Sequence, residues 1–387
     1  MTKTKFLAAT FVALLFYAVA LRAPIASIGP LLPEISEDLN LDLTQQGILT
    51  AIPVLSFGIG AFASPAFARR FGLDRSLLIL CGAIVASIAL RGWFDFLSLL
   101  IGTSVAGLAI AIANVLLPSV VRTRFPKQIA LVTASYTTVL AISASAAAAT
   151  AVPLSTTAGG WQISLFVWIA PMLIALALWW MQLDRSEERA DKTEEISHPN
   201  SVVRSPVTWA LFLFFGIQSL GFYAILSWLP SILIDQNMDP AVAGGLLGLT
   251  TIIGVPFSMA LASNFSRFRR LDWVGFLISL LTLSGFALLN FESLHLAACI
   301  LMGLGMACTF PLSLNLISTR ASSPRLTTSL STLVQGYGYL LSAVGTFAFG
   351  WLRDMSGNWT LSIWVMVALT AVQALSSFLA GGKRHID

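Results

Sequence analysis

Apolar runs long enough to cross a membrane recur along the whole chain and are separated by short polar turns. A helix that spans a bilayer needs about 20 mostly apolar residues. We find twelve such runs, and we expect helices at residues 6–32, 45–68, 76–92, 96–120, 129–153, 161–183, 206–233, 241–262, 273–290, 294–318, 327–351 and 359–381. Because helices satisfy their backbone polar groups internally, the pattern predicts an all-α membrane protein with twelve transmembrane helices in two six-helix bundles.

The composition agrees with this class of protein. Of the 387 residues, 57% are hydrophobic and 10% are charged, whereas soluble domains carry about 25% charged residues. The mean hydropathy is +0.84. The three cysteines (Cys81, Cys299 and Cys308) all lie in apolar runs, so we interpret them as small buried residues rather than as a disulfide framework.

The basic residues favour one orientation in the membrane. If both termini lie in the cytoplasm, 19 of the 22 lysines and arginines fall in inner loops, Arg91 and Arg353 lie outside, and Arg22 lies in the membrane. Cytoplasmic loops of membrane proteins carry such an excess of positive charge. We therefore expect a multi-pass membrane protein with both termini in the cytoplasm, and we interpret its basic patches as topology signals rather than as a nucleic-acid surface.

A charged segment divides the chain near its midpoint. Nine of the twelve residues from 184 to 195 are ionised, which is typical of a solvated linker. We predict an N-terminal bundle at 1–183, a charged cytoplasmic linker at 184–205 and a C-terminal bundle at 206–387. The halves also resemble each other: Asp74 and Asp272 lie 198 residues apart, as do Trp161 and Trp359. Paired repeats with a substrate site near the midplane are a known plan of transporters.

Arg22 is the one charged residue expected deep in a span. A guanidinium near the centre of a bilayer costs roughly 2.5–3.5 kcal/mol on insertion scales, and it stays charged because its pKa is above about 12. Such a group needs a wet cavity, a partner or an anionic ligand. We expect Arg22 to bind substrate; the alternative is a structural charge neutralised by helix carbonyls.

A polar stripe runs along the expected helix at 327–351. Its members recur at intervals of three and four residues, so they share one helix face; they are Thr328, Ser331, Gln335, Tyr339 and Ser342. A stripe of this kind lines a cavity or forms hydrogen bonds between helices. Six further residues on other spans are candidates for substrate contact, namely Asn114, Tyr136, Gln218, Tyr223, Phe310 and Asn315.

One loop resembles the signature loop of the major facilitator superfamily. The superfamily pattern Gly-x-x-x-Asp-Arg-x-Gly is kept as Gly-x-Asp-Arg in Ala68-Arg69-Arg70-Phe71-Gly72-Leu73-Asp74-Arg75. Within the superfamily, the chain is similar to the bacterial cyanate and 2-nitroimidazole transporters. This similarity is carried by Leu21-Arg22, Gly29-Pro30-Leu31-Leu32, Asn114-Val115-Leu116-Leu117-Pro118, Gly159-Gly160-Trp161, Trp228-Leu229-Pro230 and Gly357-Asn358-Trp359.

The resemblance implies two roles for individual residues. The first helix would line the central cavity, which places Arg22 beside the substrate path. Asp74 would form a cytoplasmic charge lock with Arg69, Arg70 and Arg75 that holds one conformer.

Acidic residues are missing from the middle of the expected spans. Proton-driven transporters commonly use a buried carboxylate or histidine as the switch. Here only Glu34 and Asp74, both near membrane surfaces, are candidates for proton linkage. We therefore expect that any coupling to protons does not pass through a midplane carboxylate.

These observations favour a monomeric secondary transporter, without cofactor or metal, that moves a small anionic or strongly dipolar solute by alternating access. The cargo would resemble cyanate or a nitro-heterocycle. A broad exporter of hydrophobic drugs, with Arg22 merely structural, is the alternative within the same class. A membrane-embedded enzyme needs clustered catalytic groups, which three dispersed histidines do not supply. A channel fits less well with doubled six-helix repeats.

Overall fold

The computed structural model describes residues 3–41, 43–91, 95–183, 199–382 and 386. These residues are helical apart from turns and one isolated bridge between Ala321 and Ile386. The contacts divide the chain into two compact units, residues 1–127 with 135–197 and residues 128–134 with 198–387. Most of the expected linker at 184–205 lies outside the described residues, so the predicted domain boundaries stay a prediction.

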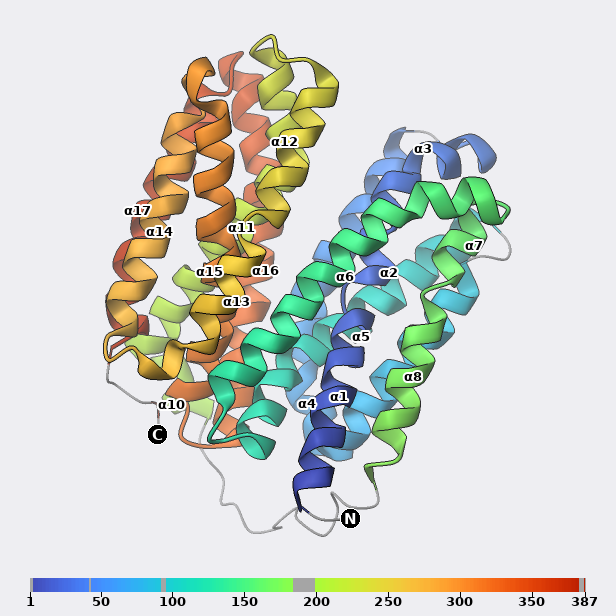
Figure 1. Ribbon diagram of the computed structural model, residues 1–387, viewed down its shortest axis with the longest axis vertical. Coiled ribbons are helices and arrows are strands. Elements are labelled where there is room, and N and C mark those ends of the chain that lie inside the picture. Colours follow the sequence, from blue (N-terminus) through green and yellow to red (C-terminus); the bar gives the residue numbers. More distant parts are fainter. Residues whose placement is uncertain (1–2, 42, 92–94, 184–198, 383–385, 387) are drawn as a thin grey trace. The chain divides into compact units, whose positions relative to one another are not determined.

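The described residues from 3 to 183 form eight helical segments, all in the first unit except the start of α6 (Figure 1). They are α1 (Lys3–Ala20), α2 (Ala23–Ala26), α3 (Ile28–Asp38), α4 (Leu43–Arg91), α5 (Phe96–Arg124), α6 (Ile129–Ala158), α7 (Trp161–Phe166) and α8 (Ile169–Trp180). Helix α1 packs against α8, and α4 packs along α5. The hydroxyl of Tyr17 on α1 donates to Leu77 O on α4 over 2.9 Å, which ties α1 to α4 as well.

The second unit contains the remaining helices. They are α10 (Pro199–Arg204), α11 (Pro206–Asp235), α12 (Pro240–Ile252), α13 (Val255–Ser263), α14 (Leu271–Leu288), α15 (His295–Arg320), α16 (Pro324–Ser356) and α17 (Thr360–Ala380), with short 3₁₀ turns at Phe265–Arg267 and Glu292–Leu294. Helix α11 packs against α16 and α17, and α14 packs against α15 and α17.

The twelve expected spans are all present as helical segments. Ten segments of the described residues are long and apolar enough to cross a membrane. One of these, at Ile52–Arg91, is 40 residues long and holds two spans, because Gly72 bends α4 with φ 75° and ψ 170°. Helix α16 is the twelfth, and its polar stripe lowers its hydropathy. The fold is therefore the predicted twelve-helix membrane fold.

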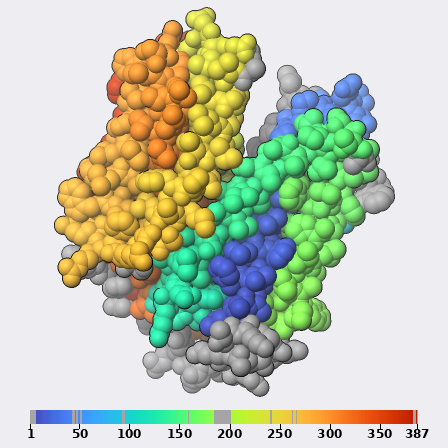
Figure 2. Space-filling model, viewed as in Figure 1, coloured from blue at the N-terminus to red at the C-terminus, as the bar shows by residue number. Residues whose placement is uncertain are grey.

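Apolar side chains are exposed on helices of both units, as a lipid-facing protein requires. Ile59, Phe62, Leu277 and Phe347 are all more than a third exposed. On the face drawn in Figure 2, α1 lies between α6 and α8. The exposed apolar surface and the buried polar stripe of α16 together indicate helices that are apolar outside and polar inside.

Glycines allow the same close packing in both units. A Cβ on Gly107 of α5 would lie 2.7 Å from Ser56 Cβ of α4, and a Cβ on Gly303 of α15 would overlap Thr250 O of α12. Gly107 and Gly303 lie 196 residues apart in the sequence. The repeated sequence pattern therefore corresponds to a repeated contact between helices.

One end of each unit is held by matching hydrogen bonds. Trp161 Nε1 donates to Asp38 over 2.9 Å, and Trp359 Nε1 donates to Asp235 over 2.9 Å. Nearby, a serine hydroxyl donates over 2.7 Å to a backbone carbonyl in each unit, Ser164 to Ala151 O and Ser362 to Phe349 O. Each pair of bonds repeats at an offset of 197–198 residues, so the two units share one scaffold.

The other end of each unit carries an aspartate–arginine pair, but the pairs differ in exposure. Asp74 accepts from Arg124 Nη2, and the two side chains are 20% and 9% exposed. Asp272 accepts from Arg270 Nη2 over 2.7 Å, and the Arg270 side chain is 65% exposed. This bond raises the pKa of Arg270 above its ordinary value. Only the first pair excludes most water.

We predict that Arg124→Gln destabilises the protein far more than Arg270→Gln does. Loss of Arg124 leaves Asp74 unpaired in a partly buried place and removes contacts with the Phe6 and Trp179 rings. Breaking a buried pair by removing one partner costs about 3–5 kcal/mol, whereas an exposed pair contributes little. Thermal unfolding of the purified variants measures the difference. Equal melting temperatures for the two variants would contradict the prediction.

Candidate functional site

The first expected span is broken at Arg22, so the continuous helix predicted at 6–32 is wrong. Helix α1 ends at Ala20 and α2 begins at Ala23, with Arg22 as its N-cap residue at φ −131° and ψ −44°. Pro24 has no N–H and therefore cannot donate to the carbonyl of Ala20. Backbone hydrogen bonds at the break span three residues instead of four, as in Arg22 N–H to Val19 O at 3.3 Å.

The break presents the Arg22 side chain at the interior of the first unit. Arg22 is half-buried, and its guanidinium carbon lies 5.9 Å from the centroid of the Phe57 ring on α4. A cation over an aromatic face gains electrostatic energy from the ring, and the guanidinium group is planar and permanently charged. The site therefore has a flat apolar wall beside a planar, permanently charged donor.

Two other predicted residues of the first unit lie on neighbouring helices. Asn114 on α5 is 9% exposed, and Tyr136 on α6 is 2% exposed. Both are buried polar groups, as the sequence predicted for residues that do not face lipid. Their role in binding stays a prediction.

Phe215 links two of the predicted residues in the second unit. Its ring lies 5.2 Å from the Tyr339 ring on α16, edge to face, and 6.1 Å from the Phe310 ring on α15. The sequence did not single out Phe215, because it lies in an apolar run with Phe212 and Phe214 and carries no polar group. Its position between two helices is visible only in the structure.

The polar stripe of α16 is buried. Thr328, Ser331, Gln335, Tyr339 and Ser342 are each 6% exposed or less. Gln335 Nε2 donates to Ser331 Oγ over 2.6 Å, so part of the stripe satisfies itself along the helix.

The remaining predicted residues of the second unit lie on α11 and α15. Gln218 accepts from Ser219 Oγ over 3.3 Å, and the Tyr223 ring lies 5.4 Å from that of Phe222. Asn315 is 2% exposed, and its Oδ1 has no hydrogen-bond partner among the described residues. A buried amide oxygen without a donor is costly and marks Asn315 as a group able to bind water or ligand.

The expected charge lock contains a residue that the sequence did not single out. Asp74 pairs with Arg124 at the end of α5, and Trp179 Nε1 donates to Asp74 O over 3.1 Å. Arg69, Arg70 and Arg75 are exposed, and Arg70 lies 5.3 Å from the Phe71 ring. Arg124 lies 50 residues from Asp74, so spacing within the loop could not indicate it.

Glu34 lies at the other end of the first unit. Its carboxylate accepts hydrogen bonds from Ser155 Oγ and, over 3.0 Å, from Trp161 N–H. These two bonds connect α3 with α6 and α7. The Glu34 carboxylate therefore holds three helices of the first unit together at this end.

Arg91, which the charge count placed on the outer side, is buried within the first unit. Its side chain is 1% exposed, and Nη1 donates to Pro24 O beside the break. The charge count placed Arg91 on the outer side because Arg91 lies at the end of the expected span at 76–92, directly after Leu90.

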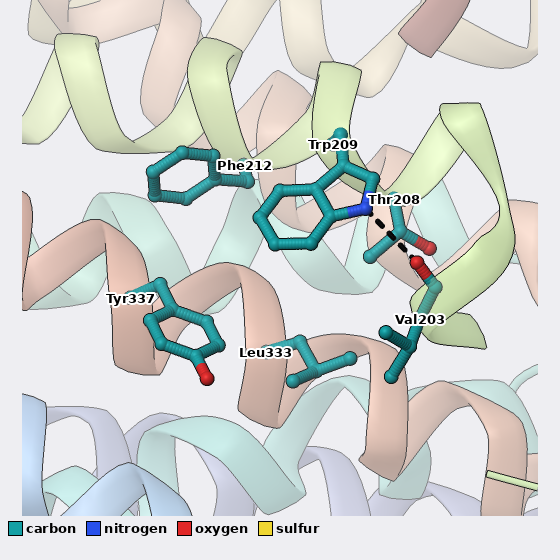
Figure 3. A pocket seen from close by; sticks show the side chains of 6 residues that line it. All are labelled: Val203, Thr208, Trp209, Phe212, Leu333 and Tyr337. Carbon is teal, nitrogen blue, oxygen red and sulfur yellow. Dashed lines mark hydrogen bonds between the residues drawn. The ribbon is translucent and has the colours of Figure 1, made fainter. Parts of the chain in front are cut away.

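A small pocket of about 70 Å³ lies in the second unit, lined by Val203, Thr208, Trp209, Phe212, Leu333 and Tyr337. The Trp209 indole donates to Val203 O over 2.9 Å and packs near the Phe212 and Tyr337 rings (Figure 3). Partly exposed aromatics near a helix end are typical of the membrane interface. None of the residues predicted to bind substrate lines this pocket.

Comparisons with known proteins agree with this architecture. The chain is 33% identical over 375 residues to the 2-nitroimidazole transporter of Escherichia coli K12, covering 96% of this chain and 95% of the relative. It is 28% identical over 363 residues to the cyanate transport protein of the same organism, covering 93% of each. A solved proton:xylose symporter has the same fold, with a TM-score of 0.77 at 12% identity over 96% of this chain and 95% of that one.

A family model described as "Major Facilitator Superfamily" matches residues 6–346. The members of this family are transporters and not enzymes. The twelve helices, the repeated contacts of the two units and this match show that the chain belongs to the Major Facilitator Superfamily of secondary transporters.

Proposed function

We propose that this transporter moves a small anionic or nitro-bearing solute, and that Arg22 binds the solute's negative charge. The observation that carries the proposal is the position of Arg22, a permanent cation at a break in the first helix and beside the Phe57 ring. Intramembrane charges usually mark the pathway of the transported solute.

The named substrates of two relatives share the chemistry that this site suits. Cyanate is a linear monoanion, and 2-nitroimidazole carries a planar nitro group whose two oxygens hold partial negative charge. A guanidinium offers paired donors in one plane to such acceptors, and Phe57 offers an apolar face to a flat ring. The modest identities of 33% and 28% support the chemical class of the cargo.

The proposal extends to location and mechanism. The distribution of 19 of 22 basic residues supports a bacterial inner membrane protein with both termini in the cytoplasm. Transport proceeds by alternating access, as in transporters built from paired repeats. The buried polar and aromatic residues of α11, α15 and α16 are candidates for hydrogen bonds with the solute, and we assign no cofactor.

We predict that Arg22→Ala reaches the membrane in normal amounts and loses solute binding. Arg22→Lys keeps the charge but not the planar pair of donors, and we expect about a tenfold weaker apparent affinity. Counterflow of radiolabelled 2-nitroimidazole and of cyanate in proteoliposomes measures both effects. Arg267→Gln, which removes an exposed arginine bonded to Asn264, is the control. Parental affinity in Arg22→Ala would refute the assignment.

The same assay separates the anion carrier from a broad drug exporter. A site built on a fixed guanidinium repels cations, so we expect small anions such as cyanate and nitrite to compete with the labelled solute. A bulky lipophilic cation such as tetraphenylphosphonium should not compete at equal concentration. Strong competition by the cation and none by the anions would favour the drug exporter.

We further predict that Glu34 carries any coupling to protons. Glu34→Gln keeps an acceptor for Trp161 N–H but cannot titrate, so uptake should lose its pH dependence while solute exchange at equilibrium continues. Asp74→Asn should weaken uptake at every pH, because it also removes the partner of Arg124. Uptake rates under an imposed pH gradient test this. An unchanged pH profile in Glu34→Gln would exclude Glu34.

A further inference from the structure

Arg91 is a buried cation that the proposed function does not use. It is the last residue of α4 and is 1% exposed. Nη1 donates to Pro24 O, while Nε and Nη2 have no hydrogen-bond partner among the described residues. Burying a charged guanidinium with spare donors is unfavourable for folding, which makes Arg91 a candidate for a specific role.

The neighbouring helix leaves room for this side chain. A Cβ on Gly102 of α5 would lie 2.8 Å from Arg91 Cγ and 2.8 Å from Ser87 O. Gly102 lets α5 approach the aliphatic part of the Arg91 side chain, and a larger residue at position 102 would displace that side chain. The fold therefore accommodates Arg91 in the interior rather than at its surface.

The carbonyl that Arg91 binds belongs to the segment that presents Arg22. Pro24 lies in α2, a helix of four residues whose N-cap is Arg22. So short a helix is unstable alone, because its first turn fixes several dihedral angles for one hydrogen bond. Its direction thus depends on contacts from outside, and the bond from Arg91 is one of them.

The second half of the chain provides an internal comparison. At the offset of 197 residues, Ser219 and Gly221 correspond to Arg22 and Pro24, and α11 runs unbroken through both as Pro206–Asp235. At offsets of 196–198 residues, Arg91 corresponds to the apolar run Ala287, Leu288 and Leu289. The first half alone therefore combines a helix break with Arg22 at the break and with Arg91, which donates to Pro24 O.

We propose that Arg91 is a positioning residue for Arg22, acting through the carbonyl of Pro24. It fixes the short α2 relative to α4 and α5, and so fixes the direction in which Arg22 leaves the break. The inference rests on the proposed role of Arg22 in binding the solute.

A spectroscopic measurement tests the positioning without any transport assay. A trifluoromethyl tag on Ala26→Cys reports the environment of α2 by ¹⁹F NMR of the full-length protein. With Arg91 present we expect one dominant resonance; Arg91→Gln should give several or shifted resonances, and Arg91→Lys should retain the original one in part. Arg267→Gln is the control and should change nothing. An identical spectrum in Arg91→Gln would overturn the proposal.

Transport kinetics then test whether the positioning acts through Arg22. We expect KM for 2-nitroimidazole counterflow to rise about tenfold in Arg91→Gln and less in Arg91→Lys. In the Arg22→Lys background, Arg91→Gln should add little, because coupled residues are not additive. A lower Vmax with unchanged KM, or fully additive effects, would contradict the proposal. If Arg91→Gln does not fold, Arg91→Lys tests the proposal with a smaller expected rise in KM, and an unchanged KM together with an unchanged ¹⁹F spectrum in Arg91→Lys would contradict it.

The two proposals fail in distinguishable ways. Parental binding by Arg22→Ala refutes the function assigned to Arg22 and leaves the ¹⁹F result standing. An unchanged ¹⁹F spectrum refutes the role of Arg91 and leaves the binding role of Arg22 intact.

Discussion

Backbone hydrogen bonding inside the membrane is the constraint on which this structure depends. Lipid offers no partner for an exposed carbonyl or N–H, so every interruption of a transmembrane helix must be compensated by the protein. The first helix is interrupted at Arg22 because Pro24 removes a donor. Around that interruption lie the half-buried cation, the Phe57 ring and the buried Arg91, which donates to the freed segment.

The two halves share some contacts between helices and differ at the proposed binding residue. Both use tryptophan–carboxylate bonds at one end, whereas the corresponding aspartates at the other end pair with arginines at different places in the repeat. The membrane cation occurs in the first half alone, with Ser219 at the corresponding place in the second. The proposed binding residue Arg22 is therefore a departure from the repeat, whereas the tryptophan–carboxylate bonds follow it.

The helices could be predicted from the sequence because apolar runs of spanning length and a recurring offset are local or periodic signals. The break at Arg22 could not, since Pro24 is tolerated within many membrane helices. The burial of Arg91 and the pairing of Asp74 with Arg124 depend on partners 67 and 50 residues away. Phe215 gave no signal either, because an aromatic between two helices has the same sequence pattern as one that faces lipid.

The central claim is that Arg22 holds the transported solute at the break in the first helix. An electron cryo-microscopy map of the full-length protein with 2-nitroimidazole bound tests it most directly. The account predicts density for the nitro group within hydrogen-bonding distance of the Arg22 guanidinium and the ring near Phe57. Density for the solute elsewhere, with Arg22 bonded only to backbone carbonyls, would contradict it.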